Sequence, residues 1–269
     1  MEKRFNHPRK PNGLPNGLGS QALPPYYLAY DERYRKVYAQ GVEFWTAHPD
    51  EVRETTESLD TFLNESSCAD PLVLECGCGE GHLAAHLIEQ GFRYIGVDIS
   101  SAAIDKARKR VARCTSRSAP VFHVADSTDL NFLEDASIDI LVDNYHFHML
   151  VTDGDRRRYL AETCRVLRGG SRAYFRENLQ ANGVLESAAT YADYLQRTSS
   201  DFTVEEEREA WQDGQVIRIR LPRVPARANS REGYYAELET AGFQVQLFRT
   251  CKSTCVLHVR KPGLPSETK

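Results

Sequence analysis

Three glycines at alternate positions, Gly77, Gly79 and Gly81, closely follow an apolar run that ends in Glu75. Glycine lets a loop backbone approach a bound molecule closely. A second apolar run ends in Asp98, and a carboxylate at the end of such a strand suits the two hydroxyls of a ribose. These residue types in this order predict a site for a cofactor that contains a nucleoside.

The spacing of the glycines separates two kinds of cofactor. A dinucleotide fingerprint reads G-x-G-x-x-G, with its third glycine inside a helix that faces a pyrophosphate. Here the pattern is G-x-G-x-G, and His82 stands where that third glycine is needed. Glu75 would repel a pyrophosphate but suits a cationic amino group. The segment resembles motif I of the class I S-adenosylmethionine-dependent methyltransferases, which implies S-adenosylmethionine as the cofactor.

The resemblance covers residues 70–177 well and residues 230–260 loosely. It implies that Asp98 binds the ribose and that Asp126 accepts a hydrogen bond from the adenine amino group. A helix cap or turn is the alternative role for Asp126 and Ser127. The cofactor-binding residues expected on this basis are Glu75, Gly77, Cys78, Gly79, Gly81, Asp98, Ile99, Asp126 and Ser127.

Candidate catalytic residues follow the apolar run at 138–143. Methyl transfer from a sulfonium is an in-line displacement, so the protein must align the reactants and supply a base for a protonated acceptor. Imidazole titrates near neutral pH, which makes His146 the first candidate base and His148 the second, with Asp143 as a positioning acceptor. Two alternatives remain. The histidines could pack at a helix start, or these three residues could bind a metal, although the expected site contains no metal.

Candidate substrate contacts are aromatic or acidic. Tyr34 and Trp45 suit a wall for a cationic or aromatic acceptor, although an aromatic stripe also packs in a core. Glu177 ends an expected strand and either points into the same pocket or is a solvated loop acid. Arg218 and Arg220 align on one side of an expected hairpin, where they would hold an anionic substrate or form an exposed face.

Composition narrows the function classes. The 269 residues carry 34 Lys and Arg against 38 Asp and Glu, and this negative balance argues against a nucleic-acid partner. No apolar run reaches the roughly 20 residues that span a bilayer, and the N-terminal residues lack the apolar core of a secretory signal. Seven scattered cysteines favour a reducing compartment. We expect a cytoplasmic enzyme with no membrane partner. Its oligomeric state stays open.

Apolar strands alternate with amphipathic helices, which predicts an α/β fold. We expect a doubly wound, mostly parallel seven-stranded sheet with an antiparallel C-terminal strand. The Arg-Val-Leu-Arg-Gly-Gly segment that ends at Gly170 resembles a family element, with Gly169 in place of a proline, and predicts a helix end. Strands are expected at 72–75, 93–98, 120–124, 138–143, 172–176, 243–248 and 254–260, and helices at 81–90, 101–113, 153–168 and 230–241.

Additional segments surround this core. Helices expected at Tyr27–Trp45 and Pro49–Asn64 form an N-terminal lid, and a helix at Val184–Gln196 precedes a hairpin around Asp213-Gly214. We hypothesise that the first helix and the hairpin cover the substrate. The alternative is that both only pack on the core. The expected organisation is a disordered arm (1–24), lid (25–69), cofactor core (70–177), cover insertion (178–229), closing helix and strands (230–261) and tail (262–269).

A covered pocket favours methylation of an O or N atom in a small-molecule acceptor. The first rival is a protein or RNA acceptor. The Asp143-Asn144-Tyr145-His146 segment lacks both prolines of the Asn/Asp-Pro-Pro-Tyr element found in enzymes that methylate base amines. Other rivals are an S-adenosylmethionine-binding module without activity and a nicotinamide-dependent oxidoreductase.

Overall fold

The computed structural model describes residues 25–45, 49–65, 68–115, 118–180 and 182–263. The expected disordered arm and most of the expected tail lie outside these ranges. Within them, no helix is both long enough and apolar enough to cross a membrane.

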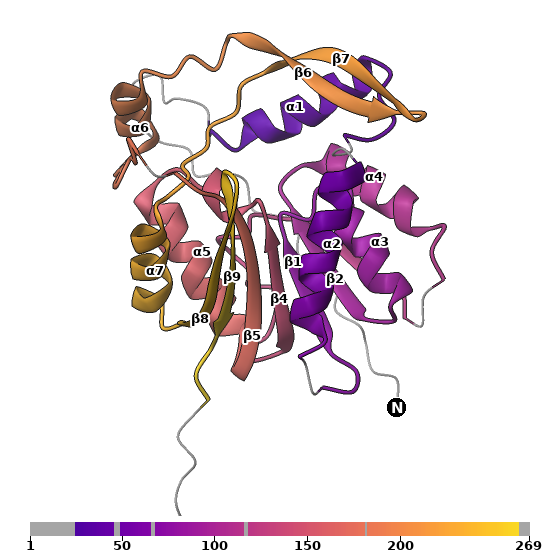
Figure 1. Ribbon diagram of the computed structural model, residues 1–269, viewed down its shortest axis with the longest axis vertical. Coiled ribbons are helices and arrows are strands. Elements are labelled where there is room, and N and C mark those ends of the chain that lie inside the picture. The colour runs from indigo at the N-terminus through magenta and orange to yellow at the C-terminus, as the bar shows by residue number, and fades with distance from the viewer. Residues whose placement is uncertain (1–24, 46–48, 66–67, 116–117, 181, 264–269) are drawn as a thin grey trace, which may run out of the picture.

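The centre of the fold is a seven-stranded sheet with the order β3-β2-β1-β4-β5-β9-β8 (Figure 1). The first five strands pair in parallel, and β9 is antiparallel to both β5 and β8. The predicted doubly wound sheet is therefore confirmed. The strands are β1 (Leu72–Cys76), β2 (Arg93–Asp98), β3 (Val121–Val124), β4 (Ile138–Asn144), β5 (Leu167–Asn178), β8 (Gln244–Cys251) and β9 (Thr254–Arg260).

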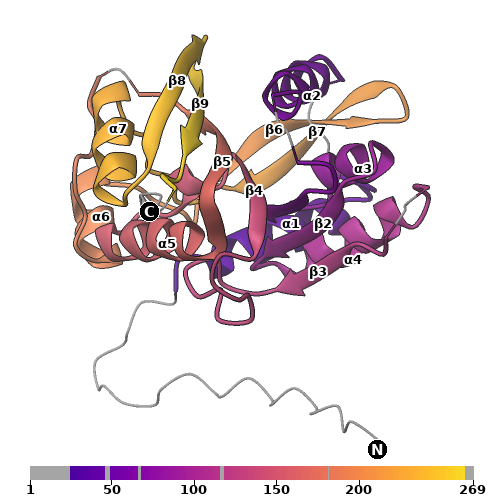
Figure 2. The ribbon, with the colours of Figure 1, turned by 90° about the horizontal axis from the view of Figure 1, so that it is seen from below.

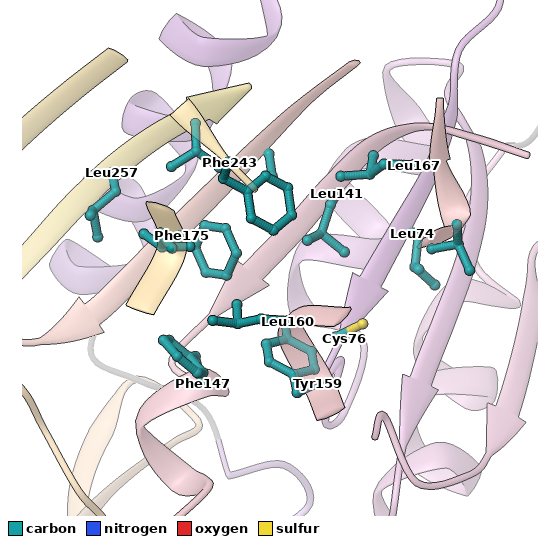
Figure 3. Close-up of a cluster of buried hydrophobic side chains, with 14 of the residues drawn as sticks. Leu74, Cys76, Leu141, Phe147, Tyr159, Leu160, Leu167, Phe175, Phe243 and Leu257 are labelled. Carbon is teal, nitrogen blue, oxygen red and sulfur yellow. The ribbon is translucent and has the colours of Figure 1, made fainter. Parts of the chain in front are cut away.

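Helices cover both faces of the sheet, because successive side chains of a strand point to opposite sides. Val73 packs in a cluster with α2, α3 and α4, whereas Leu74 packs with α5 and α7. Figure 3 shows part of the second cluster, in which Phe147 and Tyr159 lie near Phe175. The helices are α2 (Pro49–Leu63), α3 (His82–Glu89), α4 (Ser101–Val111), α5 (Asp153–Val166) and α7 (Arg231–Thr240).

A helix and a hairpin lie across the carboxyl ends of the parallel strands (Figure 1 and Figure 2). The helix is α1 (Leu28–Ala39), and the hairpin consists of β6 (Glu205–Gln212) and β7 (Gln215–Pro222). The hairpin turn is Asp213-Gly214, with φ values of 50° and 79°, as a two-residue primed turn requires. Val37 of α1 packs against apolar residues of the hairpin. The predicted hairpin is confirmed.

Two helices at the periphery differ from the prediction. The helix α1 ends at Ala39, six residues before Trp45. The segment expected to be helical over Val184–Gln196 instead forms α6 (Tyr191–Thr198). Thr190 sets its start, because the Thr190 side chain accepts a hydrogen bond from the backbone N–H of Asp193 and caps the helix.

The prediction that a helix ends at the segment containing Gly169 and Gly170 is wrong. The helix α5 ends at Val166, and β5 already begins at Leu167, which pairs with Ile138. The backbone N–H of Ser137 donates to the carbonyl of Val166, so pairing with the neighbouring strand ends the helix before the glycines. Gly169 therefore lies inside a strand.

Candidate functional site

The strand register brings the ends of four parallel strands to one edge of the sheet. Cys76 of β1 pairs with Val97 of β2 and with Asp143 of β4, and Asp98 pairs with Val124 of β3. The strand order reverses between β1 and β4, and open α/β sheets bind ligands in the crevice at such a reversal. The residues that follow these strands form the candidate site.

The loop after β1 needs its glycines. Gly77 and Gly79 have φ values of 69° and 50°, in the left-handed region that disfavours side chains. A Cβ atom at Gly77 would lie 2.5 Å from the Cβ of His146, and one at Gly79 would lie 2.7 Å from the hydroxyl of Tyr34. A side chain at either position would therefore displace His146 or Tyr34, so the loop packs closely only with glycine there.

The amides of this loop are already bonded within the protein. The N–H groups of Gly77 and Cys78 both donate to the carbonyl of Val97, at 2.8 and 3.0 Å, and the N–H of Gly79 donates to Asp98. A pyrophosphate site instead presents free amides to its ligand. The donor set therefore suits a nucleoside without a pyrophosphate.

Backbone hydrogen bonds hold the Asp98 carboxylate in an orientation that suits a ligand. Its Oδ2 accepts the N–H of Gly79 and its Oδ1 accepts the N–H of Ser100, each at 2.8 Å. A carboxylate has about four acceptor positions, so Asp98 keeps capacity for a ribose hydroxyl after accepting these backbone groups. Burial raises the pKa of Asp98 to about 6, which leaves it mostly ionised at neutral pH.

A cavity of about 290 Å³ lies between this edge and α1. Asp126 and Ser127 line it, and Asp126 also accepts the N–H of Thr128 at 2.8 Å, so the turn role is present as well. Five of the predicted cofactor residues meet here: Gly77, Asp98, Ile99, Asp126 and Ser127.

The other side of the cavity is largely aromatic, and both predicted aromatic contacts, Tyr34 and Trp45, line it. Figure 1 shows α1, which carries Tyr30 and Tyr34, crossing above the ends of the strands. A flat apolar molecule would make offset or edge contacts with such rings. The aromatic lining comprises Tyr26, Tyr27, Tyr30, Tyr34, Trp45 and Tyr145.

His146 lines the cavity beside the glycine loop. Its Nε2 lies 2.7 Å from the Ser127 hydroxyl oxygen, and its backbone N–H donates to Asp143 at 2.9 Å. The preceding Tyr145 has a φ of 64°, a left-handed conformation that costs roughly 1–2 kcal/mol. Burial lowers the pKa of His146, so the ring is neutral near pH 7 and able to accept a proton.

His148 and Glu177 do not reach the cavity, which corrects their expected placement. The turn η1 (Phe147–Met149) sends His148 into the core, where its Nδ1 lies 2.5 Å from Glu177 and its Nε2 lies 3.1 Å from the Asn178 amide nitrogen. Burial lowers the pKa of His148 to about 4. These residues hold the turn in place and leave His146 as the candidate base.

Asp143 is also buried, and it accepts a hydrogen bond from the backbone of His146, as a positioning acceptor would. Its Oδ2 accepts the Tyr159 hydroxyl at 2.5 Å, and its Oδ1 accepts the backbone N–H groups of His146 and Phe147. The three residues that would have formed a metal site thus point to different partners. In the described part of the chain, no group of His, Cys, Asp and Glu residues is suited to a metal ion.

Glu75 and Cys78 are buried below the loop and do not line the cavity. Glu75 is 3% exposed, and it accepts the Tyr94 hydroxyl at 2.5 Å. Burial raises the pKa of Glu75 to about 8. Glu75 is therefore mostly neutral near pH 7 and lies outside the cavity lining. Gly81 packs its backbone against Ala107 of α4.

Comparisons with known proteins agree with this arrangement. Residues 73–170 match the methyltransferase domain family. An uncharacterized methyltransferase of Geobacillus sp. is 30% identical over 151 residues, which is 55% of this chain and 66% of the relative. An O-methyltransferase of Aspergillus sclerotiorum is 33% identical over 108 residues, which is 40% of this chain and 39% of the relative. The chain belongs to the class I S-adenosylmethionine-dependent methyltransferases.

A solved structure supports the fold of this methyltransferase. The 1,6-didemethyltoxoflavin-N1-methyltransferase of Burkholderia thailandensis superposes with a TM-score of 0.59 at 20% identity, over 91% of this chain and 93% of its own. The chain spans less than two thirds of the length of each curated relative named above.

Sequence reasoning on this methyltransferase missed Arg33, which also lines the cavity. The signal was present in the helical period. Arg33 lies three residues after Tyr30 and four before Val37, which both line the cavity, so the three residues share one face of α1.

Proposed function

We propose that this methyltransferase transfers a methyl group from S-adenosylmethionine to an O or N atom of a small aromatic molecule. The observation that carries the proposal is a single cavity in which the glycine loop and Asp98 face an aromatic wall, with His146 between them. The names of the Aspergillus and Burkholderia proteins, an O- and an N-methyltransferase, support it.

The residues that line the cavity have different roles in the proposed reaction. When bound, S-adenosylmethionine would supply a methyl group activated by a sulfonium, with neutral S-adenosylhomocysteine as the leaving group that keeps the electron pair of the carbon–sulfur bond. Asp98 holds the ribose hydroxyls, and His146 takes the proton that the acceptor loses. The aromatic side chains orient the acceptor and exclude water.

The cover favours a compact acceptor. The carboxylate of Glu80, beside the glycine loop, accepts the Tyr38 hydroxyl at 2.8 Å and the backbone N–H of Trp45 at 2.7 Å. Asp31 accepts the Ser100 hydroxyl at 2.7 Å. These bonds tie α1 to the loops that hold the cofactor, so a substrate must fit beneath α1, on which the hairpin packs.

Replacing Asp98 with alanine is expected to weaken S-adenosylhomocysteine binding by about 10- to 150-fold, because two charge-assisted hydrogen bonds to the ribose are lost. Isothermal titration calorimetry measures the change. The Asp105→Ala variant is the control, since Asp105 is exposed on α4. Unchanged affinity in Asp98→Ala would remove Asp98 from the ribose site.

Affinity for S-adenosylmethionine should increase relative to that for S-adenosylhomocysteine as the pH rises from about 5.5 to 8.5. Burial raises the pKa of Asp98 to about 6 and that of Glu75 to about 8, so the neutral forms predominate at the low end of this range and the ionised forms at the high end. Their negative charges favour a sulfonium over a neutral thioether. Calorimetry across the range tests this, and Glu75→Gln should flatten the upper part. A constant ratio in the wild type would contradict the charge argument.

The acceptor can be found by incubating the enzyme with a metabolite extract and S-adenosylmethionine that carries a labelled methyl group. Mass spectrometry should reveal a small molecule that gains one labelled methyl. Label found only in protein or RNA would overturn the small-molecule proposal. Cofactor binding without label transfer across broad acceptor sets would instead favour a non-catalytic module.

A further inference from the structure

Arg33 is a half-buried cation in the wall of the aromatic cavity. Its guanidinium carbon lies 5.2 Å from the centre of the Trp45 ring. Throughout the described residues, its guanidinium has no partner in a hydrogen bond or an ion pair. An arginine normally presents five N–H donors, so this one has its binding capacity available.

The hairpin does not neutralise Arg33. Glu206 of β6 attracts it, but Glu206 is already paired with Arg208 and lies 3.2 Å from Arg223. Arg208 adds positive charge. Burial, followed by the repulsion from Arg208, lowers the pKa of Arg33. Taking a charge out of water without a partner is costly, and an anion that enters the cavity would relieve that cost.

The arginines of the hairpin, unlike Arg33 of α1, do not lie in the cavity wall. Arg218 lies 3.4 Å from Glu207 across the strand pair, and Arg220 lies within 3.4 Å of the carbonyl of Glu205. Neither lines the cavity. Asp155, an acid that does line it, accepts the hydroxyls of Tyr26 and Thr152. In the described part of the cavity wall, Arg33 is the one arginine or lysine.

We infer that Arg33 binds an anionic group of the methyl acceptor, which is then an aromatic compound that carries a carboxylate or a similar oxyanion beside the hydroxyl or amine that is methylated. The inference rests on the proposed function and deepens it. A guanidinium matches the two oxygens of a carboxylate, while the surrounding rings pack on an aromatic frame. The carboxylate of the cofactor itself is a second source of the same chemistry, and the experiment separates the two.

The first arm compares benzoate with benzamide, which have the same shape and differ in charge. Binding to the enzyme saturated with S-adenosylhomocysteine is measured by ligand-observed NMR titration. The wild type should prefer benzoate by about tenfold or more, as expected for hydrogen bonds to a charged group. Arg33→Gln should lose this preference and Arg33→Lys should keep part of it. Arg35→Gln, on the same helix with a 60% exposed side chain, should retain it in full.

The second arm tests the carboxylate of the cofactor. S-adenosylhomocysteine carries that group, and 5′-methylthioadenosine lacks the whole amino-acid portion. Arg33→Gln should bind both as tightly as the wild type does. Weaker binding of S-adenosylhomocysteine alone would place Arg33 at the cofactor and overturn the inference. A wild type without preference for benzoate would overturn it too. A wild type that fails to bind S-adenosylhomocysteine would instead refute the proposed function.

Discussion

Replacing His146 with glutamine should lower kcat by about 10²- to 10⁴-fold and leave the affinity for S-adenosylmethionine within a few-fold of the wild type. The ring lies in the cavity wall, held through Ser127 and Asp143, and it is neutral near pH 7. Glutamine keeps hydrogen-bonding capacity there but cannot accept the proton. The measurement is kcat for the acceptor identified by labelling, with His123→Gln on β3, outside the cavity lining, as the control.

The same variant should change the pH profile. Because burial lowers the pKa of His146, the kcat of the wild type should rise with pH through a value below 6.5 and level off near neutrality. His146→Gln should lack this rise. If kcat is unchanged in the variant, or if the rise persists without the imidazole, His146 is not the base.

Replacing Gly77 with alanine should reduce S-adenosylhomocysteine affinity at least tenfold and lower Tm by several degrees. The left-handed backbone alone costs roughly 1–2 kcal/mol with a side chain present. In addition, the new methyl group would lie 2.5 Å from the Cβ of His146, an atom that can move only with its backbone. The loop and His146 must therefore separate, and the cradle for the cofactor is lost.

Gly154→Ala is the matched control for this change. Gly154 lies in the first turn of α5, without a positive φ, and the nearest atom to an added Cβ is the end of the Arg158 side chain at 3.4 Å. Alanine is favoured over glycine in a helix by about 1 kcal/mol, so the Tm of this variant should stay the same or rise. Wild-type affinity and Tm in Gly77→Ala would show that the loop is not a close-fitting cradle.

Local sequence pattern was enough to predict the sheet and the cofactor half of the site. Strands such as β1 and β2 are short apolar runs between helices, and their ends determine where Gly77 and Asp98 lie. The role of Gly77 depends on backbone conformation, which the residue type itself reveals. The strand ends and the residues that follow them are local features of the sequence. The parallel register of the strands then places them together at one edge of the sheet.

The remaining site features depend on contacts that are distant in sequence. His146 and His148 are two residues apart, and only the η1 turn, held by Glu177 from β5, sends one to the cavity and the other into the core. The position of Arg33 follows from the packing of α1 beneath a hairpin about 170 residues later. The period of α1 indicated a buried stripe but not what it would face.

The most direct measurement is a calorimetric titration of the 269-residue protein with S-adenosylhomocysteine, repeated with Asp98→Ala. If the loop after β1 and the carboxylate of Asp98 form the cofactor site, the wild type will show saturable binding of one molecule per chain, and the variant will bind far more weakly. No detectable binding by the folded wild type, or equal binding by both proteins, would contradict this account of the site.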